Sequence, residues 1–264
     1  MFHRQSHPPR FDGHHAVGRN WPRRLALVCL LANAGWADDS RGGESETFVS
    51  LFNGRDLSGW EGEPGWWRVE DGAITAQSTS DKPCQRHTYL IWRGGEPGDF
   101  ELRLEYRLTG GNSGIQFRSR EVPPWDTSGY QADMDAKGQW TGALFEHTRG
   151  GIALRGERAV VDAEGQRRVT AIGDPATLLK KVKSDDWNKY RIVAERDRIS
   201  LRINGVLMAE VVDRQRGHAA QSGIIALQMH PGPPMKVQFR NLRIRIDDPQ
   251  DRASTETPRT AATK

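Results

Sequence analysis

The sequence predicts an all-β protein folded as a two-sheet jelly-roll sandwich. Apolar and charged residues alternate with period two along many short segments, and Gly- or Asn-containing turns separate these segments. Beyond residue 37 no stretch shows a convincing helical stripe. Sandwiches of about 200 residues commonly form one domain. We therefore expect a single β-sandwich domain over residues 48–246 of this 264-residue chain.

The N-terminal segment has the three parts of a secretory signal. Arg23-Arg24 precede the apolar run 25–31, and Gly35-Trp36-Ala37 supplies small residues for cleavage. The apolar run is too short to span a bilayer. We expect residues 1–37 to be a signal peptide, with export to the periplasm or the extracellular space and no membrane span.

Polar segments flank the expected domain on both sides. Residues 38–47 are rich in Gly, Ser and acidic side chains and are interpreted as a linker. Residues 247–264 form a charged tail with no apolar face, which favours disorder. The sequence does not determine an oligomeric state.

The charge of the chain argues against a nucleic-acid partner. The formal net charge is +4, but residues 1–37 hold five arginines and one aspartate, which leaves 33 basic and 33 acidic residues in the remainder. Phosphate-backbone binding relies on a clustered surplus of positive charge. Cys84 is the single cysteine after residue 37, which excludes an internal disulfide and a zinc–thiolate site. We expect its thiol to be buried and inert.

Individual elements follow from the alternation. Residues 100–108 alternate throughout and are a strand, and Asn204-Gly205 is a strong signal for a two-residue hairpin. The apolar phase slips by one residue near Asn241, which predicts a β-bulge. Residues 176–182 could form one short helix or a turn.

Several motifs occur in the order known from one family. They are Leu51-Phe-Asn-Gly-Arg-Asp-Leu-Ser-Gly-Trp60, Trp67-Arg-Val-Glu-Asp-Gly72, Gly111-Asn-Ser-Gly-Ile-Gln-Phe-Arg118, Gly129-Tyr-Gln-Ala-Asp133, Gly142-Ala-Leu-Phe-Glu146, Trp187-Asn-Lys-Tyr190, Gly223-Ile-Ile-Ala-Leu-Gln-Met-His230 and Phe239-Arg-Asn-Leu-Arg243. With them the chain resembles the 3-keto-disaccharide hydrolase domain, also called DUF1080, across about 200 residues. The resemblance implies a concanavalin A-like lectin/glucanase fold and action on glycosides whose C3 is oxidised to a ketone.

One stretch departs from a related class of enzymes. Laminarinase-type jelly rolls carry catalytic acids as Glu-x-Asp-x-(x)-Glu on one strand, whereas this chain has Gln131-Ala-Asp133-Met-Asp135. A glutamine thus stands at the nucleophile position. Retaining hydrolysis with two carboxylates about 5 Å apart is not supported on this strand.

Strand alternation also selects a polar face. Apolar residues such as Ile115, Tyr130 and Leu227 go to the core, which sends their neighbours to the other side. The residues expected to line one concave surface are Gln116, Arg118, Gln131, Asp133, Glu146, Gln228 and His230. The alternative is that they are ordinary solvent-facing residues of a sandwich.

These residues suggest a mechanism for an activated substrate. A C3 ketone acidifies the C2 hydrogen, so His230, Asp133 or Glu146 could act as the base that removes it, with loss of the C1 substituent. Arg118 would stabilise the enolate oxygen. We expect no cofactor and no metal, although a divalent cation could bind the oxygen-rich site. A non-catalytic carbohydrate-binding module is the alternative function, and the expected partner in both cases is a carbohydrate.

The remaining candidates are residues expected to bind substrate and histidines expected to lie outside the site. Gln116, Arg118, Gln131 and Gln228 are expected to bind substrate, and so is Trp125, which follows two prolines and could stack on a sugar ring. Trp140 is a second candidate for stacking. His87 and His218 are expected to be solvated, and His147 is expected to point away from the polar face.

Overall fold

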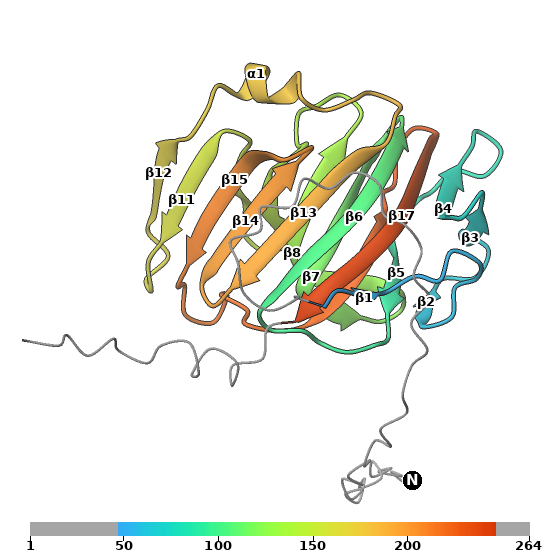
Figure 1. The fold of residues 1–264 in the computed structure, drawn as a ribbon, viewed down its shortest axis with the longest axis horizontal. Coiled ribbons are helices and arrows are strands. Elements are labelled where there is room, and N and C mark those ends of the chain that lie inside the picture. Colours follow the sequence, from blue (N-terminus) through green and yellow to red (C-terminus); the bar gives the residue numbers. More distant parts are fainter. Residues whose placement is uncertain (1–46, 247–264) are drawn as a thin grey trace, which may run out of the picture. The chain divides into compact units, whose positions relative to one another are not determined.

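The computed structural model describes residues 47–246, which form two β-sheets packed face to face (Figure 1). The expected signal peptide and tail, and the linker apart from Thr47, lie outside the described residues. No helix in this part of the chain is long and apolar enough to cross a membrane. The prediction of an all-β sandwich with two sheets is confirmed.

The larger sheet has ten strands and forms one layer. They are β1 (Val49–Ser50), β3 (Trp67–Glu70), β4 (Ala73–Ser78), β6 (Phe100–Thr109), β11 (Glu157–Val161), β12 (Arg167–Ala171), β13 (Asn188–Glu195), β14 (Arg198–Ile203), β15 (Val206–Asp213) and β17 (Met235–Ile246). Their order is β12-β11-β15-β14-β13-β6-β17-β4-β3, and β1 pairs with β17. Only the β11–β15 pair in this sheet is parallel.

The smaller sheet has seven strands, all paired antiparallel, and carries the polar face. They are β2 (Trp60–Gly62), β5 (Thr88–Trp92), β7 (Asn112–Val122), β8 (Asp126–Asp135), β9 (Leu144–Glu146), β10 (Gly150–Ala153) and β16 (Ile224–Met229). Their order is β10-β9-β8-β7-β16-β5-β2. Strands far apart in the sequence, such as β7 and β16, thus become neighbours.

The core lies between the sheets and follows the predicted alternation. In β13 buried and half-buried residues alternate along all eight positions, and one apolar cluster joins Leu102 of the large sheet to Ile115 of the small sheet. Cys84 is free and buried, as predicted, and burial raises the pKa of its thiol.

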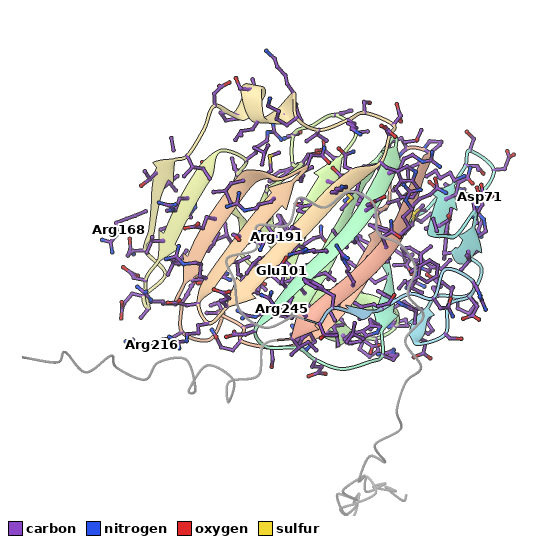
Figure 2. The ribbon with its side chains drawn as sticks, in the orientation of Figure 1. Asp71, Glu101, Arg168, Arg191, Arg216 and Arg245 are labelled. Carbon is purple, nitrogen blue, oxygen red and sulfur yellow. The ribbon has the colours of Figure 1, made fainter. Side chains whose placement is uncertain are left out.

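Ion pairs occupy the outer face of the large sheet. Glu101 is 1% exposed and lies against Arg191 and Arg245 in Figure 2, with Arg191 Nε 2.6 Å from Glu101 Oε1. Burial raises the pKa of Glu101, but hydrogen bonds from Arg191 and Arg103 outweigh burial and bring the pKa below its usual range. The arginines around Glu101 thus favour its ionised form despite its burial.

Turn residues explain the remaining local features. Asn204 and Gly205 have φ of 50° and 83° and join β14 to β15, as the hairpin signal predicted. The predicted bulge is present in β17, where the register shifts between Arg240 and Arg243 around Asn241 at φ 55°. The short helix α1 (Pro175–Leu179) begins after Asp174, whose Oδ1 accepts a hydrogen bond from the amide of Thr177.

Candidate functional site

Three glutamines form the floor of a polar site on the outer face of the small sheet. Gln116 on β7 lies directly opposite Gln131 on β8, and Gln131 lies opposite Phe145 on β9. Directly opposed residues in an antiparallel pair share a face. Gln228 joins them from β16. We call Gln116, Gln131 and Gln228 the amide floor; their side chains are all buried.

Hydrogen bonds run through the amide floor in one direction. Gln116 Nε2 donates to Gln131 Oε1 at 2.9 Å, and Gln131 Nε2 donates to Gln228 Oε1 at 3.3 Å. Gln131 Nε2 also donates to Asp133 Oδ1 at 2.6 Å. Gln228 Nε2 then donates to the hydroxyl of Tyr89 at 2.8 Å. Each amide therefore accepts through oxygen and donates through nitrogen, which satisfies these buried polar groups.

A glycine makes this arrangement possible. Gly114 of β7 lies opposite Asp133, and a Cβ at Gly114 would be 2.4 Å from Cδ of Gln131. No real Cβ approaches another atom so closely, so the amide of Gln131 occupies the space that a side chain at residue 114 would fill. The floor thus depends on the absence of a side chain at this position.

Three histidines lie next to the amide floor. The ring centroids of His87 and His230 are 4.7 Å apart, and those of His87 and His147 are 6.4 Å apart, both with edge-to-face geometry. All three are half-buried. We call His87, His147 and His230 the imidazole cluster.

Hydrogen bonds fix which nitrogen of each imidazole carries the proton. His230 Nδ1 is 2.5 Å from the carbonyl oxygen of Pro231. A carbonyl can only accept, so in its neutral form His230 carries hydrogen on Nδ1 and keeps a free lone pair on Nε2. His87 Nδ1 is 3.2 Å from Gln228 Nε2, and His147 Nδ1 is 3.4 Å from Gln116 Nε2.

The two floor amides donate to these Nδ1 atoms, so His87 and His147 carry hydrogen on Nε2 in their neutral forms. Burial, and next the neighbouring His230, lower the pKa of His87, which favours its neutral form. In their neutral forms the three rings therefore offer one acceptor, Nε2 of His230, and two hydrogen-bond donors, the Nε2–H groups of His87 and His147.

Asp133 is the carboxyl group of the site. It is 4% exposed. Burial raises its pKa, the hydrogen bond from Gln131 lowers it, and the charge of Asp135 raises it again, with a result of about 7. A carboxyl group with this pKa exchanges protons readily at neutral pH.

The raised pKa of Asp133 predicts a pH-dependent effect on stability. The folded protein favours the protonated carboxyl, so this favourable contribution is complete below about pH 4 and is lost as pH rises toward 7. Asp133→Asn removes the ionisation, and we expect it to raise the free energy of unfolding at pH 8 by up to about 4 kcal/mol, with little change at pH 4. Urea unfolding at both pH values measures this. Equal effects at the two pH values would contradict the raised pKa.

The structure does not place Arg118 on the polar face. Its backbone has φ of 44°, and next to it the register shifts in the pairing of β7 with β8 and in the pairing of β7 with β16. The alternation of side chains therefore breaks at this residue. Its guanidinium donates to the carbonyl oxygens of Gly98 and Arg196 and to Asp99 Oδ1 at 2.7–2.9 Å. The expectation that Arg118 lines the site is therefore wrong, because a bulge turns it toward the loops of the large sheet.

Glu146 also lies on the other face. It is opposite Tyr130 in β8, whereas Phe145 is opposite Gln131, so the predicted phase of β9 is wrong by one residue. Arg149 connects Glu146 at 3.0 Å to Asp213 of the large sheet at 2.7 Å. Burial raises the pKa of Glu146, but Thr148 and Arg149 outweigh it and keep the pKa below its usual range.

Glu146→Gln should therefore affect stability rather than catalysis. The change removes the charge that pairs with Arg149, and we expect the free energy of unfolding to fall by about 1–3 kcal/mol. Turnover per folded molecule should stay at the wild-type level. Urea unfolding and a turnover assay on the same preparation measure both. A variant of normal stability without turnover would place Glu146 in the chemistry after all.

The structure also adds residues that the sequence prediction missed. His147 lies on the polar face, not opposite it, and His87 is half-buried in the imidazole cluster, not solvated. Strand alternation, extended one residue beyond β9 and β5, gives both placements: His147 is two residues after Phe145, and His87 is two before Tyr89. His218 is exposed, as expected.

Trp125 lies in the turn between β7 and β8. It is half-buried, and its carbonyl oxygen accepts a hydrogen bond from the amide of Tyr89 at 2.9 Å. This bond holds the turn beside β5. The stacking of Trp125 on a sugar stays a prediction.

The described residues give no evidence for a bound metal. Among residues 47–246 no group of three or more His, Cys, Asp or Glu side chains is arranged to hold a metal ion. The expected absence of a cofactor stays a prediction.

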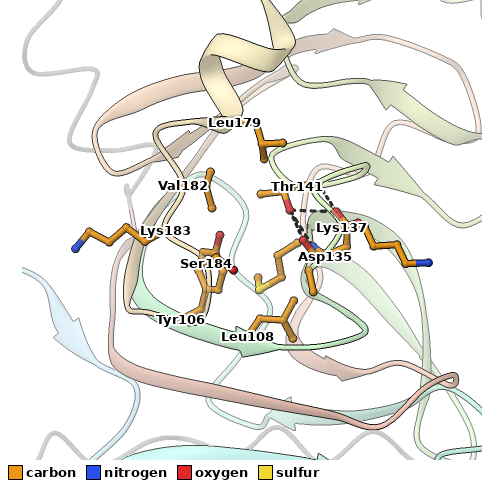
Figure 3. Close-up of a pocket in the computed structure, with 12 residues that line it drawn as sticks. Tyr106, Leu108, Asp135, Lys137, Thr141, Leu179, Val182, Lys183 and Ser184 are labelled. Atoms are coloured by element: carbon orange, nitrogen blue, oxygen red, sulfur yellow. Dashed lines mark hydrogen bonds between the residues drawn. The ribbon is translucent and has the colours of Figure 1, made fainter.

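A separate cavity of about 190 Å³ lies on the core side of β8 (Figure 3). Tyr106, Leu108, Met134, Leu179 and Val182 contribute to its lining. Met134 points to the opposite face from Asp133 because they are consecutive in a strand. The cavity therefore does not belong to the polar site.

The fold and the site define a jelly-roll domain with a polar, hydrogen-bonded site on its smaller sheet. The family model described as the 3-keto-alpha-glucoside-1,2-lyase-like domain matches residues 47–245. The chain belongs to this family, which confirms the resemblance drawn from the motifs. No curated protein matches the chain.

Solved structures with similarity to the chain have low sequence identity to it, and the first of them, with a TM-score above 0.5, shares its fold. A Parabacteroides distasonis protein with the provisional name glycosyl hydrolase is 19% identical, with a TM-score of 0.53, over 76% of this chain and all of that one. The carbohydrate-binding module CBM66 of Bacillus subtilis is 16% identical, with a TM-score of 0.48, over 71% of this chain and 95% of that one. The β-glucanase of Bacillus licheniformis is 11% identical, with a TM-score of 0.48, over 79% of this chain and all of that one.

Proposed function

We propose that this protein is a lyase that cleaves 3-keto-glycosides by removing the C2 proton and expelling the C1 substituent. The observation that carries the proposal is the tautomer of His230, whose Nδ1 hydrogen bond to Pro231 leaves Nε2 free to accept a proton. Membership of the family supports the substrate class.

The proposed reaction uses the groups as the structure arranges them. His230 Nε2 takes the C2 proton, and the electrons of the C2–H bond move to the C3 oxygen as an enolate. The Nε2–H groups of His87 and His147 donate hydrogen bonds to that oxygen and so stabilise the enolate, the role first expected for Arg118. Collapse of the enolate forms a C1=C2 double bond and breaks the C1–O bond. Asp133, with a pKa of about 7, gives its proton to the leaving oxygen, and water then adds to the product.

The assay compares a 3-keto disaccharide with its unoxidised form in D₂O. Release of a monosaccharide from the keto form alone, with deuterium incorporated at C2, supports the elimination. Release without deuterium would indicate direct hydrolysis and contradict the proposal.

A carbohydrate-binding module is the second candidate. It is favoured by Gln131, an amide where laminarinase-type enzymes carry a nucleophile, and by an amide floor that is already hydrogen-bonded. Saturable binding of the sugar without conversion would establish this function. For either function we propose export, which the mass of the mature N-terminus tests.

A further inference from the structure

We propose that the site has a second subsite, beside the amide floor, which binds the leaving-group ring of a disaccharide on an aromatic platform. The platform consists of Trp140, Phe145 and Leu154. This inference rests on the proposed function, because it names the part of the substrate that the C1 bond releases.

The platform is continuous with the imidazole cluster. The ring centroids of Trp140 and Phe145 are 6.1 Å apart, and those of Phe145 and His147 are 6.0 Å apart, both with edge-to-face geometry. Phe145 is directly opposite Gln131, so it stands on the same face as the amide floor. A row of rings thus extends from His147 toward the β10 edge of the sheet.

A glycine allows Trp140 to lie on this face. Gly151 of β10 is opposite Phe145, so a side chain at residue 151 would point to the same side. A Cβ there would be 3.4 Å from Cζ3 of Trp140 and 3.1 Å from Cδ2 of Leu154. The indole and Leu154 therefore cover the space above Gly151, and together with Phe145 they form one apolar surface.

The backbone holds Trp140 in place before any ligand arrives. Its amide donates to Asp135 Oδ1 at 2.7 Å, and its carbonyl oxygen accepts from the amide of Ala143 at 2.8 Å. Asp135 also accepts from the amides of Gln139 and Thr141. A residue whose backbone is already fixed loses less conformational entropy on binding.

The exposed fractions of the apolar side chains show that the open apolar surface lies on the β9 and β10 side of the amide floor. Leu154 is 42% exposed, and Trp140 and Phe145 are half-buried. On the other side of the floor, Tyr89 and Ile91 belong to a small apolar cluster and are fully buried. A ring that needs an apolar surface therefore finds one near β9 and β10.

The distance from the chemistry fits a second sugar ring. Neighbouring strands are about 4.8 Å apart, so β9 and β10 lie about 5 and 10 Å across the sheet from β8, which carries Asp133. A pyranose joined through the glycosidic oxygen reaches this range. Its C–H face is apolar and would bury against the indole, while its hydroxyl groups stay in water.

The test compares three 3-keto-glucosides that differ in the leaving group: a glucosyl disaccharide, a methyl glucoside and an aryl glucoside. For Trp140→Ala we expect kcat/KM for the disaccharide to fall about tenfold, the size of one aromatic contact. The value for the methyl glucoside, which has no second ring, should not change. Trp140→Phe should recover most of the loss, and thermal melting shows that the variants are folded.

The outcomes separate this inference from the proposed function. An equal loss on the disaccharide and the methyl glucoside, or no loss on either, overturns the subsite. A loss on the aryl glucoside alone also overturns it, because the occupant would then be an aryl group. If the wild type converts none of the three, the proposed function fails. The subsite can then still be tested by titration with unoxidised disaccharide and methyl glucoside, followed by tryptophan fluorescence. The subsite requires that Trp140→Ala binds the disaccharide more weakly than the wild type does.

Discussion

His230→Ala should lower kcat for 3-keto-glycoside cleavage by about a hundred- to ten-thousand-fold, the usual cost of losing a general base. In the neutral form of His230 the hydrogen bond to Pro231 puts the hydrogen on Nδ1 and leaves Nε2 able to accept a proton, and the ring centroid lies 4.7 Å from that of His87. His230 is only half-buried, so truncation opens no core cavity, and the free energy of unfolding should change by no more than about 1 kcal/mol. Steady-state kinetics and urea unfolding measure the two effects.

His218→Ala is the matched control for this experiment. His218 is exposed and lies outside the imidazole cluster, so its removal should leave kcat unchanged. Gln228→Ala should raise KM more than it lowers kcat, because an amide can orient a hydroxyl group but cannot exchange a proton at neutral pH. Near-wild-type turnover in His230→Ala would show that the base lies elsewhere, and near-wild-type turnover in Asp133→Asn would show that another group protonates the leaving oxygen.

Arg118→Ala should destabilise the fold by about 3–5 kcal/mol, the usual cost of breaking a buried ion pair from one side. Arg118 is 2% exposed, and its guanidinium is bound to Asp99 and to the carbonyl oxygens of Gly98 and Arg196. Truncation would remove the guanidinium donor from these three acceptors, and Asp99 Oδ1 would keep its hydrogen bond from the amide of Arg196. Urea or thermal unfolding measures the loss.

Arg120→Ala provides the comparison for Arg118. Arg120 is on the same strand and exposed, so its truncation should change the free energy of unfolding by less than about 0.5 kcal/mol. Arg118→Lys should also be destabilised, because one ammonium group cannot reproduce the planar set of donors. If Arg118→Ala were as stable as Arg120→Ala, the guanidinium would not be joining the two sheets.

The fold was predictable because alternation over long segments is a strong signal. Residues 100–108 and the Asn241 bulge were both read from the apolar phase, and β6 and β17 have these features. The resemblance to one family added the type of sandwich. The order of the strands came from the structure, because no local pattern specifies that β7 lies between β8 and β16.

The site was predictable in part. Gln116, Gln131 and Gln228 lie on strands of 6 to 11 residues whose phase is fixed by several core residues, and the structure brings them together. Glu146 was misplaced because β9 has only three residues, too few to fix a phase. Arg118 was misplaced because one residue with positive φ interrupts the alternation.

The one-way amide floor links the charge of Asp133 to the histidines. An ionised carboxylate can only accept, so Asp133 requires Gln131 to present its nitrogen, and Gln131 Oε1 must then face Gln116. Gln116 in turn offers a hydrogen to His147, while Gln228 offers one to His87. The three neutral amides of the floor thus connect the carboxyl group of Asp133 to the imidazole rings of His87 and His147 by hydrogen bonds. The protonation of Asp133 and the tautomers of His87 and His147 are therefore coupled. A proton gained or lost at Asp133 changes the hydrogen bonds that orient the amides, and the amides select the two tautomers.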